Sequence, residues 1–532
     1  MPGQGEWKCR RARHGLAAGL LLALVTSVPT RADEGAIAVE DLRPGLVTEY
    51  RDEGRPPVTV VRLEPTIALA LNRGEAPHPR LQGDGGSAHW EGYLNVLRAG
   101  NYRFQARVRG RFRLLVAGKP VLEVAAQEKE PMDQEGPETR LEAGVHRLQA
   151  EFIRLPGSAR LEVLWQAPFF HQEPLPFDHL GHLPAQVPAS LDAHQRQEHG
   201  RFLVEEYGCL RCHRPAAGDR LAQVLLSRQG PDLSQAGRRL SAAWIYHWLE
   251  SPPTMQPGAV MPCLFRADET GRVERYAVAQ YLASLGGPLK PDKHPLQGDE
   301  LKTAQEHGRQ LFTSTGCMAC HREKGDARKE KPSPAAWETE RLRLFPLKGL
   351  GSQTTPEKLA DYLNNPLTVD PSGRMPSMVL RGHEARDLAY FLCASRDAAV
   401  DATEEDDWAD FQDLAPDDQL LPLGKHLVSS KGCTNCHTIT PGGQALPSIP
   451  AAAAFEDLKK ASAQSRGCLA DQPSSGEGHS SPLFAWRPGD RDSLRLFLRE
   501  GVRGAGSPAP AYAAGVALER FNCLACHQRD GA

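Results

Sequence analysis

The sequence lacks a surplus of charge of either sign. Its 63 Lys and Arg residues nearly balance its 66 Asp and Glu residues, and the formal net charge is −3. A protein that attracts nucleic acid through its overall field carries a strong positive surplus, so we expect no nucleic-acid partner. With 40% hydrophobic and 24% charged residues, the composition excludes a chain that is disordered throughout or collagen-like. The 532 residues predict several domains.

Long apolar runs are also absent. The apolar run Leu16–Val28 is too short for a membrane span, which needs about 20 residues. Basic residues precede it and small residues follow it, so residues 1–32 are predicted to be a secretory signal peptide, with an uncleaved anchor as the alternative. No later segment is long and apolar enough to span a bilayer. We therefore expect an exported protein, periplasmic or at the cell surface, without a transmembrane segment after cleavage.

The first third of the chain has the pattern of a β domain. Residues 45–168 alternate apolar and polar side chains in short runs broken by glycine, which predicts an antiparallel β-sandwich. In chain order the segment contains GLVTEY, WEGYLNVLRAGNYRFQARV, LLVAGKPVLE, LEAGVHRLQAEF and RLEVLWQ. In these pieces it resembles the PA14 family. The resemblance implies a PA14-like sandwich, and some members of that family bind sugars through a calcium ion held by adjacent aspartates.

The turn where such an acidic pair would be expected differs from that pattern. Residues 108–111 read Val-Arg-Gly-Arg, so calcium-dependent sugar binding is not expected here. A basic cluster surrounds the turn: Arg103, Arg107, Arg109, Arg111 and Arg113. It is either a docking site for an anionic glycan or cell-surface polymer, or a solvated hairpin tip. The Pro-rich segment that follows, residues 169–192, is predicted to be a linker.

Four copies of the motif CxxCH hold eight of the 12 cysteines. The motif residues are Cys209, Cys212, His213, Cys317, Cys320, His321, Cys433, Cys436, His437, Cys523, Cys526 and His527. Two thiols at this spacing add across the two vinyl groups of haem, and the next His becomes the proximal iron ligand. Four copies behind a signal peptide predict up to four covalently attached haems c.

Two other uses of paired cysteines fit the sequence less well. A zinc ribbon places two CxxC units about 15–20 residues apart, and the units here are much more widely separated. A thioredoxin-type redox pair requires a βαβ context, whereas the flanks here have helical periodicity. Outside the motifs, Cys263, Cys393 and Cys468 are either small buried apolar residues or partners in a disulfide, which export permits.

A glycine recurs ahead of every motif. Gly200, Gly308 and Gly424 each stand nine residues before the first cysteine of their motif, and Gly515 stands eight before its own. Apolar residues follow at helical spacing, which predicts a helix leading into each motif. A glycine on that face allows another helix to approach closely.

The first two motifs are followed by similar elements. After the first come GPDL, a predicted helix over 241–252, Met261-Pro262 and a closing helix over 275–287. After the second come a helical segment within 348–367, Met375-Pro376 and a closing helix over 385–395. Together these units resemble class I c-type cytochrome domains.

That resemblance implies the iron ligands. They would be His213, Met261, His321, Met375, His437 and His527, with Met261 and Met375 as sixth ligands, and with Met255 and Met378 nearby in sequence. His–Met ligation raises the reduction potential, which suits electron transfer.

No methionine follows Met378, so the third unit departs from this pattern. We predict that the haem of Cys433, Cys436 and His437 has a sixth ligand other than Met. The candidates within the chain are His479, Lys459, Lys460 and, less favoured, Cys468. An open or water-bound iron and a Met from beyond Ala532 are the alternatives. The fourth motif is read as the start of a truncated fourth unit.

The predicted fold class is multidomain, with an N-terminal antiparallel β-sandwich followed by small all-α cytochrome c domains. The predicted order after residues 1–32 is a PA14-like sandwich (45–168), a linker (169–192), cytochrome c domains (193–288 and 301–397), an acidic linker (398–417), a third cytochrome c-like domain (418–505) and the start of a fourth (511–532). The predicted function is electron transfer to redox partner proteins, with an electron carrier favoured over a turnover enzyme. The alternatives are a multihaem peroxidase-like oxidoreductase with one open iron, and haem units accessory to a surface-binding module.

Overall fold

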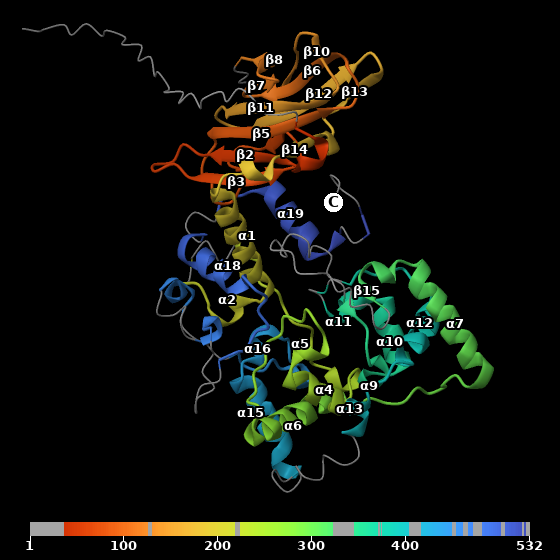
Figure 1. The fold of residues 1–532 in the computed structure, drawn as a ribbon. Coiled ribbons are helices and arrows are strands. Elements are labelled where there is room, and N and C mark those ends of the chain that lie inside the picture. Colours follow the sequence, from red (N-terminus) through yellow and green to blue (C-terminus); the bar gives the residue numbers. More distant parts are fainter. Residues whose placement is uncertain are drawn as a thin grey trace, which may run out of the picture.

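The computed structural model has a β half and a helical half (Figure 1). The structure describes residues 37–125, 130–216, 218, 224–322, 345–370, 373, 375–403, 417–448, 454–460, 467–471, 481–501, 506–523 and 526–527. The predicted signal peptide and His479 lie outside these residues. Within them, no helix has the length and apolar character needed to cross a membrane.

Two antiparallel sheets form the β half. The larger sheet contains β1 (Arg43–Pro44), β2 (Leu46–Arg51), β3 (Thr59–Glu64), β5 (Gly86–Val96), β7 (Arg111–Val116), β8 (Lys119–Val124), β11 (Gly144–Arg154) and β14 (Leu180–His182). The smaller sheet contains β4 (Ala68–Leu71), β6 (Gly100–Arg109), β9 (Met132–Glu135), β10 (Thr139–Leu141), β12 (Ala159–Ala167) and β13 (Phe170–Pro174).

Alternation along these strands buries one face of each sheet. In β6 every second side chain is buried, and the core between the sheets contains Trp90, Phe104, Phe112 and Phe152, none more than 1% exposed. Each large aromatic side chain of this kind buries a large apolar area between two packed sheets. The predicted antiparallel β-sandwich is therefore confirmed.

The predicted linker over 169–192 is wrong for most of its length. β13 pairs with β12, and β14 pairs with β1 and β5. Leu175 and Leu180 are buried in the sandwich core. The prolines lie at strand ends and turns, where the missing N–H removes no hydrogen bond between strands. A Pro-rich composition is therefore compatible with two short strands, and taking it as evidence for a linker was the source of the error.

The helical half follows β14. Its helices are α1 (Ser190–Glu206), α2 (Cys209–Cys212), α4 (Ala242–Glu250), α5 (Pro252–Met255), α6 (Glu269–Ser284), α7 (Gly298–Ser314), α9 (Leu350–Gln353), α10 (Pro356–Asn364), α11 (Pro366–Val369), α12 (Gly382–Cys393), α13 (Ala398–Ala402), α15 (Asp417–Ser430), α16 (Cys433–Cys436), α18 (Asp490–Leu496) and α19 (Pro510–Arg520). A π-helical turn, Phe497–Gly501, extends α18. Short 3-10 turns include Cys317–Ala319 and Phe455–Lys459, and the pair β15 (His321–Arg322) and β16 (Phe345–Pro346) is parallel.

One apolar cluster of the helical half is continuous in sequence. We call it the α7 core: α7, α10 and α12 pack around Phe312, Leu363 and Leu388, with Cys317 and Met375 at its edge. It falls within the predicted domain 301–397. The predicted acidic linker begins with the short helix α13, whose Val400 is buried, and its residues 404–416 lie outside the described part.

The other two clusters each join segments that are far apart in the chain. In the α6 core, α6 packs against both α15 and α4, around Ala277, Tyr281 and Val428. In the α1 core, α1 packs against α18 and the turns after residue 454, around Val204, Phe455 and Phe497. Figure 1 shows the same exchange, with the blue helices α15 and α18 lying beside the green α6 and the yellow α1 respectively.

This exchange corrects two predicted domain boundaries. The segments 193–288 and 418–505 are not separate units, because each gives one half to the α1 core and the other half to the α6 core. Helical periodicity reports which face of a helix is buried and carries no information on which partner covers it.

The recurring glycines lie at the helix crossings. A Cβ added at Gly200 would stand 2.1 Å from the Ser493 carbonyl oxygen, and one at Gly424 would stand 2.2 Å from that of Ala277. Gly308 is equivalent, with the Asp387 carbonyl oxygen at 2.3 Å, whereas nothing described lies within 4 Å at Gly515. The predicted close helix approach is confirmed at three of the four glycines.

The C-terminal helix α19 lies beside α1, below the sandwich (Figure 1). Arg520 donates to Glu205 at 2.6 Å and to Glu206 at 3.2 Å, and both carboxylates are almost fully buried. At the other end, the Ala76 amide donates to the Pro508 carbonyl at 2.8 Å. α19 therefore ties the sandwich to the α1 core.

Candidate functional site

All four CxxCH motifs begin with the same backbone feature. The residue before the first cysteine is left-handed in each: Gly208 (φ 61°), Gly316 (φ 90°), Gly432 (φ 78°) and Asn522 (φ 54°). Gly and Asn are the residues that adopt this conformation at least cost. The left-handed residue ends the preceding helix and starts a new turn that carries the two thiols.

The turn itself is closed by a backbone hydrogen bond. The amides of His213, His437 and His527 each donate to the first cysteine's carbonyl, at 2.8, 2.9 and 3.0 Å. In the second motif the Cys320 amide donates to Cys317 at 3.2 Å instead. One turn therefore brings two cysteines and a histidine together, although the sequence spacing alone does not require it.

Two of the motif histidines are held by backbone carbonyls. His437 Nδ1 lies 2.9 Å from the Pro231 oxygen, and His321 Nδ1 lies 3.0 Å from the Phe345 oxygen. Since a carbonyl only accepts, Nδ1 carries the proton and Nε2 keeps its lone pair, the form in which imidazole binds a metal. Burial lowers the pKa of both histidines, which favours the same neutral form.

Contact with the His437 ring also explains a glycine in the GPDL segment. A Cβ at Gly230 would stand 2.5 Å from His437 Cε1, so a side chain there would displace the ring. His213 is half-buried, as His321 and His437 are, whereas His527 is exposed.

The motifs adjoin one another in two pairs. Asn435, inside the third motif, donates to Cys212 Sγ of the first motif at 3.8 Å. Asn522, just before the fourth motif, donates to Cys320 Sγ of the second motif at 3.7 Å. Sulfur is a weak acceptor, so these contacts identify neighbours rather than strong bonds. Sequence reasoning missed this pairing, because its only trace is an asparagine in or beside two of the motifs.

Every cysteine that the structure describes is a free thiol. Burial raises the pKa of Cys433 to about 12 and that of Cys436 to about 11. Outside the motifs, Cys468 packs in the α1 core beside Cys209, and burial raises the pKa of Cys393 to about 12. Among the described residues, no group of three or more His, Cys, Asp and Glu side chains is arranged to hold a metal ion.

The predicted sixth ligands fall in two cores. Met375 is half-buried at the edge of the α7 core, which also contains Cys317. Met378 approaches the same motif, since its Cε lies 3.9 Å from a Cβ built at Gly316. Met261 belongs to the α6 core, where Trp248 Nε1 donates to its sulfur at 3.1 Å.

Two of the three nitrogen candidates for the predicted third haem lie in the described part of the chain. Lys459 and Lys460 are exposed, and Lys460 pairs with Asp457 at 2.7 Å. His479 lies outside the described residues.

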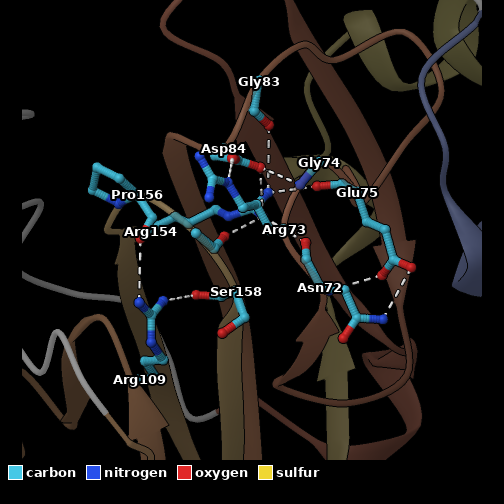
Figure 2. Close-up of polar contacts among 11 residues, drawn as sticks. Asn72, Arg73, Gly74, Glu75, Gly83, Asp84, Arg109, Arg154, Pro156 and Ser158 are labelled. Carbon is cyan, nitrogen blue, oxygen red and sulfur yellow. Dashed lines mark hydrogen bonds and ion pairs between the residues drawn. The ribbon is translucent and has the colours of Figure 1, made fainter.

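The arginine cluster of the sandwich is largely paired within the protein. Arg103 lies 2.9 Å from Glu135, and Arg113 lies 2.7 Å from Glu123. Figure 2 shows Arg109 donating to the backbone carbonyls of Pro156 and Ser158. These contacts favour the solvated-hairpin interpretation.

A small, partly open hollow at the edge of the sandwich is lined by residues that include Tyr50, Phe152 and Arg154. The Arg154 side chain is 5% exposed and donates to the carbonyls of Glu75 at 2.6 Å and Asn72 at 3.0 Å (Figure 2). Its guanidinium is thus engaged with backbone oxygens, and it fastens the loop before β5 rather than offering a charge to a ligand.

The comparisons with known proteins bear on the β half. The PA14 domain family model matches residues 42–168, so the chain contains a PA14 domain there. No curated protein matches the chain.

Several solved structures are similar to part of the chain. An anti-sigma factor domain-containing protein from Clostridium clariflavum is 20% identical over 26% of this chain and 47% of its own, with a TM-score of 0.24. A PA14 sugar-binding domain from an RTX adhesin is 16% identical over 26% and 98%, with a TM-score of 0.21. The Epithelial Adhesin 9 A domain from Candida glabrata, solved with Galb1-4GlcNAc, is 13% identical over 28% and 94%, with a TM-score of 0.23. The chain spans about half the length of the anti-sigma factor domain-containing proteins that it matches.

Proposed function

We propose that this protein is an exported multihaem c-type cytochrome that transfers electrons through haems attached at its four CxxCH motifs. When bound, haem supplies the one-electron chemistry of its iron. The observation that carries the proposal is the arrangement of the motifs in adjoining pairs, first with third and second with fourth. Electron transfer falls steeply with distance, so a carrier needs cofactors that lie close together.

The residues present fit the group. The motif thiols are free, and His321 and His437 keep Nε2 available for iron. Apolar side chains surround Cys209, Cys317 and Cys433 in the three cores, which provides the water-poor setting that tunes a haem potential. In this proposal Cys209, Cys212, Cys317, Cys320, Cys433, Cys436, Cys523 and Cys526 attach haem, and His213, His321, His437 and His527 are the proximal ligands.

Haem counting tests the proposal. We expect a pyridine haemochrome assay and intact mass to give three or four haems per chain after expression with a haem-attachment system. Replacing the two cysteines of one motif with Ala should lower the count by one. A mass without haem would refute the proposal.

The proposed pairing of the first haem with the third can be tested separately by measuring reduction potentials. Removing the third haem with Cys433→Ala and Cys436→Ala should shift the potential of the first haem and leave that of the second unchanged. Equal shifts at both would show that the proposed pairs do not behave as units.

A peroxidase-like oxidoreductase is the second candidate, favoured by one observation. The α1 core surrounds Cys209 and includes no methionine among its described residues, so the first iron is a candidate for an open position. Turnover of peroxide with a reduced donor, abolished by Cys209→Ala with Cys212→Ala and retained in the equivalent change at the second motif, would support this function.

For the PA14 domain we propose attachment to glycan at the cell surface, supported by the family match. A glycan array probed with the full chain tests it, with calcium present and with calcium chelated. Because the 108–111 turn has no acidic pair, binding that survives chelation is expected. No binding to any glycan would refute this part alone.

A further inference from the structure

The loop after the first motif wraps around the third. The Gly230 amide donates to the Cys436 carbonyl at 2.9 Å, and the Leu233 amide donates to Thr438 at 2.9 Å. Between them, Pro231 supplies the carbonyl that holds His437 Nδ1. Pro231 of the GPDL segment, 206 positions before His437, therefore orients the third motif histidine.

The helices repeat this exchange. α15, which leads into the third motif, crosses α6 at Gly424 and Ala277. A partly buried ion pair reinforces the crossing, with Lys431 Nζ 2.7 Å from Glu274 and both side chains about one-fifth exposed. α1, which leads into the first motif, instead crosses α18 at Gly200 and Ser493.

Met261 lies in the α6 core, the cluster that also contains Cys433 of the third motif. It packs there together with Cys433 and Val428, and its sulfur accepts a hydrogen bond from Trp248. The α1 core, which holds Cys209, contains Cys468 and Trp486 instead. Met261 thus shares an apolar cluster with the third motif and not with the motif that precedes it in sequence.

The α7 core shows how a CxxCH motif and a methionine are arranged when both come from one continuous segment. There Phe345 holds His321, α12 crosses α7 at Gly308, and Met375 packs with Cys317. Pro231, α6 and Met261 have the corresponding places around His437. The two cores contain the same parts, and only their order along the chain differs.

We propose that Met261 is the sixth ligand of the haem at His437, so that one haem site is assembled from residues 230–287 and 417–446. This inference rests on the proposed function. It replaces the prediction that the third haem lacks a Met ligand, and it takes from the first haem, at His213, the methionine that the sequence order had assigned to it.

The test is carried out on the full chain with haem attached. Methionines labelled with ¹³C at the methyl group report ligation directly, because the ring current of a reduced haem shifts the methyl of a bound Met far upfield. We expect two shifted signals, one lost in Met261→Leu and the other in Met375→Leu. Leu keeps most of the volume, so the fold should persist by circular dichroism. Met378→Leu is the matched control and should keep both signals.

Motif deletions then assign the Met261 signal to one haem. In Cys209→Ala with Cys212→Ala, both shifted signals should remain, since the α6 core is intact. In Cys433→Ala with Cys436→Ala, only the Met261 signal should disappear. The reverse result, with the Met261 signal lost on deleting the first motif, overturns the inference and leaves the proposed function standing. Haem present without any Met261 signal also overturns it, whereas a chain without haem refutes the proposed function instead.

Discussion

The α7 core and the α6 core contain similar parts and differ in how the chain supplies them. The α7 core is built from one continuous stretch of the chain, residues 298–393, so its two halves are neighbours in sequence. The α6 core takes α4 and α6 from one segment and α15 from another, with the whole α7 core between them in sequence. Closing such a loop costs more conformational entropy and delays folding until the distant half exists. A repeated motif in a sequence therefore does not define a contiguous domain.

Cutting the chain gives the largest expected difference between the two cores. A fragment of residues 294–403 retains every buried side chain of the α7 core, so we expect it to fold, to unfold cooperatively in urea and to resist proteolysis. A fragment of residues 190–288 retains α1 and α6 without the helices that cover them, so we expect it to be degraded. A cooperative transition in the second fragment would restore the continuous domain predicted over 193–288.

No described residue lies within 4 Å of a Cβ built at Gly515, so α19 is expected to depend on the ion pairs of Arg520 for its attachment to the α1 core. Arg520→Ala leaves Glu205 and Glu206 buried beside the weaker partners Arg201 at 3.4 Å and Arg228 at 3.6 Å. We expect a loss of about 3 kcal/mol in the free energy of unfolding of the α1 core, since breaking a buried ion pair leaves uncompensated charge. Arg520→Lys should lose less, because it keeps the charge. Equal losses would mean that packing of the arginine stem matters more than its charge.

Glycine substitutions test the helix crossings themselves. Gly200→Ala, Gly308→Ala and Gly424→Ala each place a Cβ within 2.3 Å of a carbonyl oxygen on the crossing helix. We expect each to cost about 1–3 kcal/mol, the usual cost of overpacking, as measured by urea denaturation. Gly515→Ala is the control, and should stabilise α19 by up to about 1 kcal/mol because Ala favours helix and meets no neighbour.

A further contrast separates Gly424 from Gly200. Gly424→Ala should perturb the environment of Met261, which lies in the α6 core, and of Trp248, which donates to its sulfur. Gly200→Ala should instead perturb Trp486 in the α1 core. To read the two sites separately, Trp248 or Trp486 is replaced by Phe, and the tryptophan fluorescence of the other is measured in each glycine variant. A change in the Trp248 signal caused by Gly200→Ala would contradict the exchange of segments between the two cores.

These contrasts show which features of the fold could be predicted from the sequence and which could not. Strand alternation around Tyr102 and Phe104 predicted the sandwich, and the glycine spacing predicted a close crossing at Gly308, because both patterns are local. The partner of α15 could not be predicted, since α6 and α18 both offer an apolar face with helical spacing. The same limit applies to the site: motif spacing identified His437, whereas the carbonyl that holds it comes from Pro231, 206 positions away.

The smallest expected change in the free energy of unfolding comes from the junction between the sandwich and the helices, and this change depends on pH. Glu198 on α1 lies 3.4 Å from Arg62 and 3.3 Å from His78 of the sandwich. Burial alone would raise the pKa of Glu198, but Arg62, His78 and His194 outweigh it and lower the pKa to about 2. A carboxyl whose pKa is depressed in the folded state stabilises the fold above its unfolded pKa, and loses that contribution as the pH falls toward the folded value.

From an unfolded pKa of 4.5 and a folded value of about 2, the loss amounts to about 1 kcal/mol between pH 7 and pH 4. His78 adds a loss in the same direction, because burial depresses its pKa, so wild type and Glu198→Gln must be compared at each pH. Urea denaturation at pH 7 and pH 4 should show Glu198→Gln less stable than wild type at pH 7, with the gap narrowing by about 1 kcal/mol at pH 4. A gap that stays constant would mean that Glu198 is not ionised against Arg62 and that the junction is held by its apolar and backbone contacts alone.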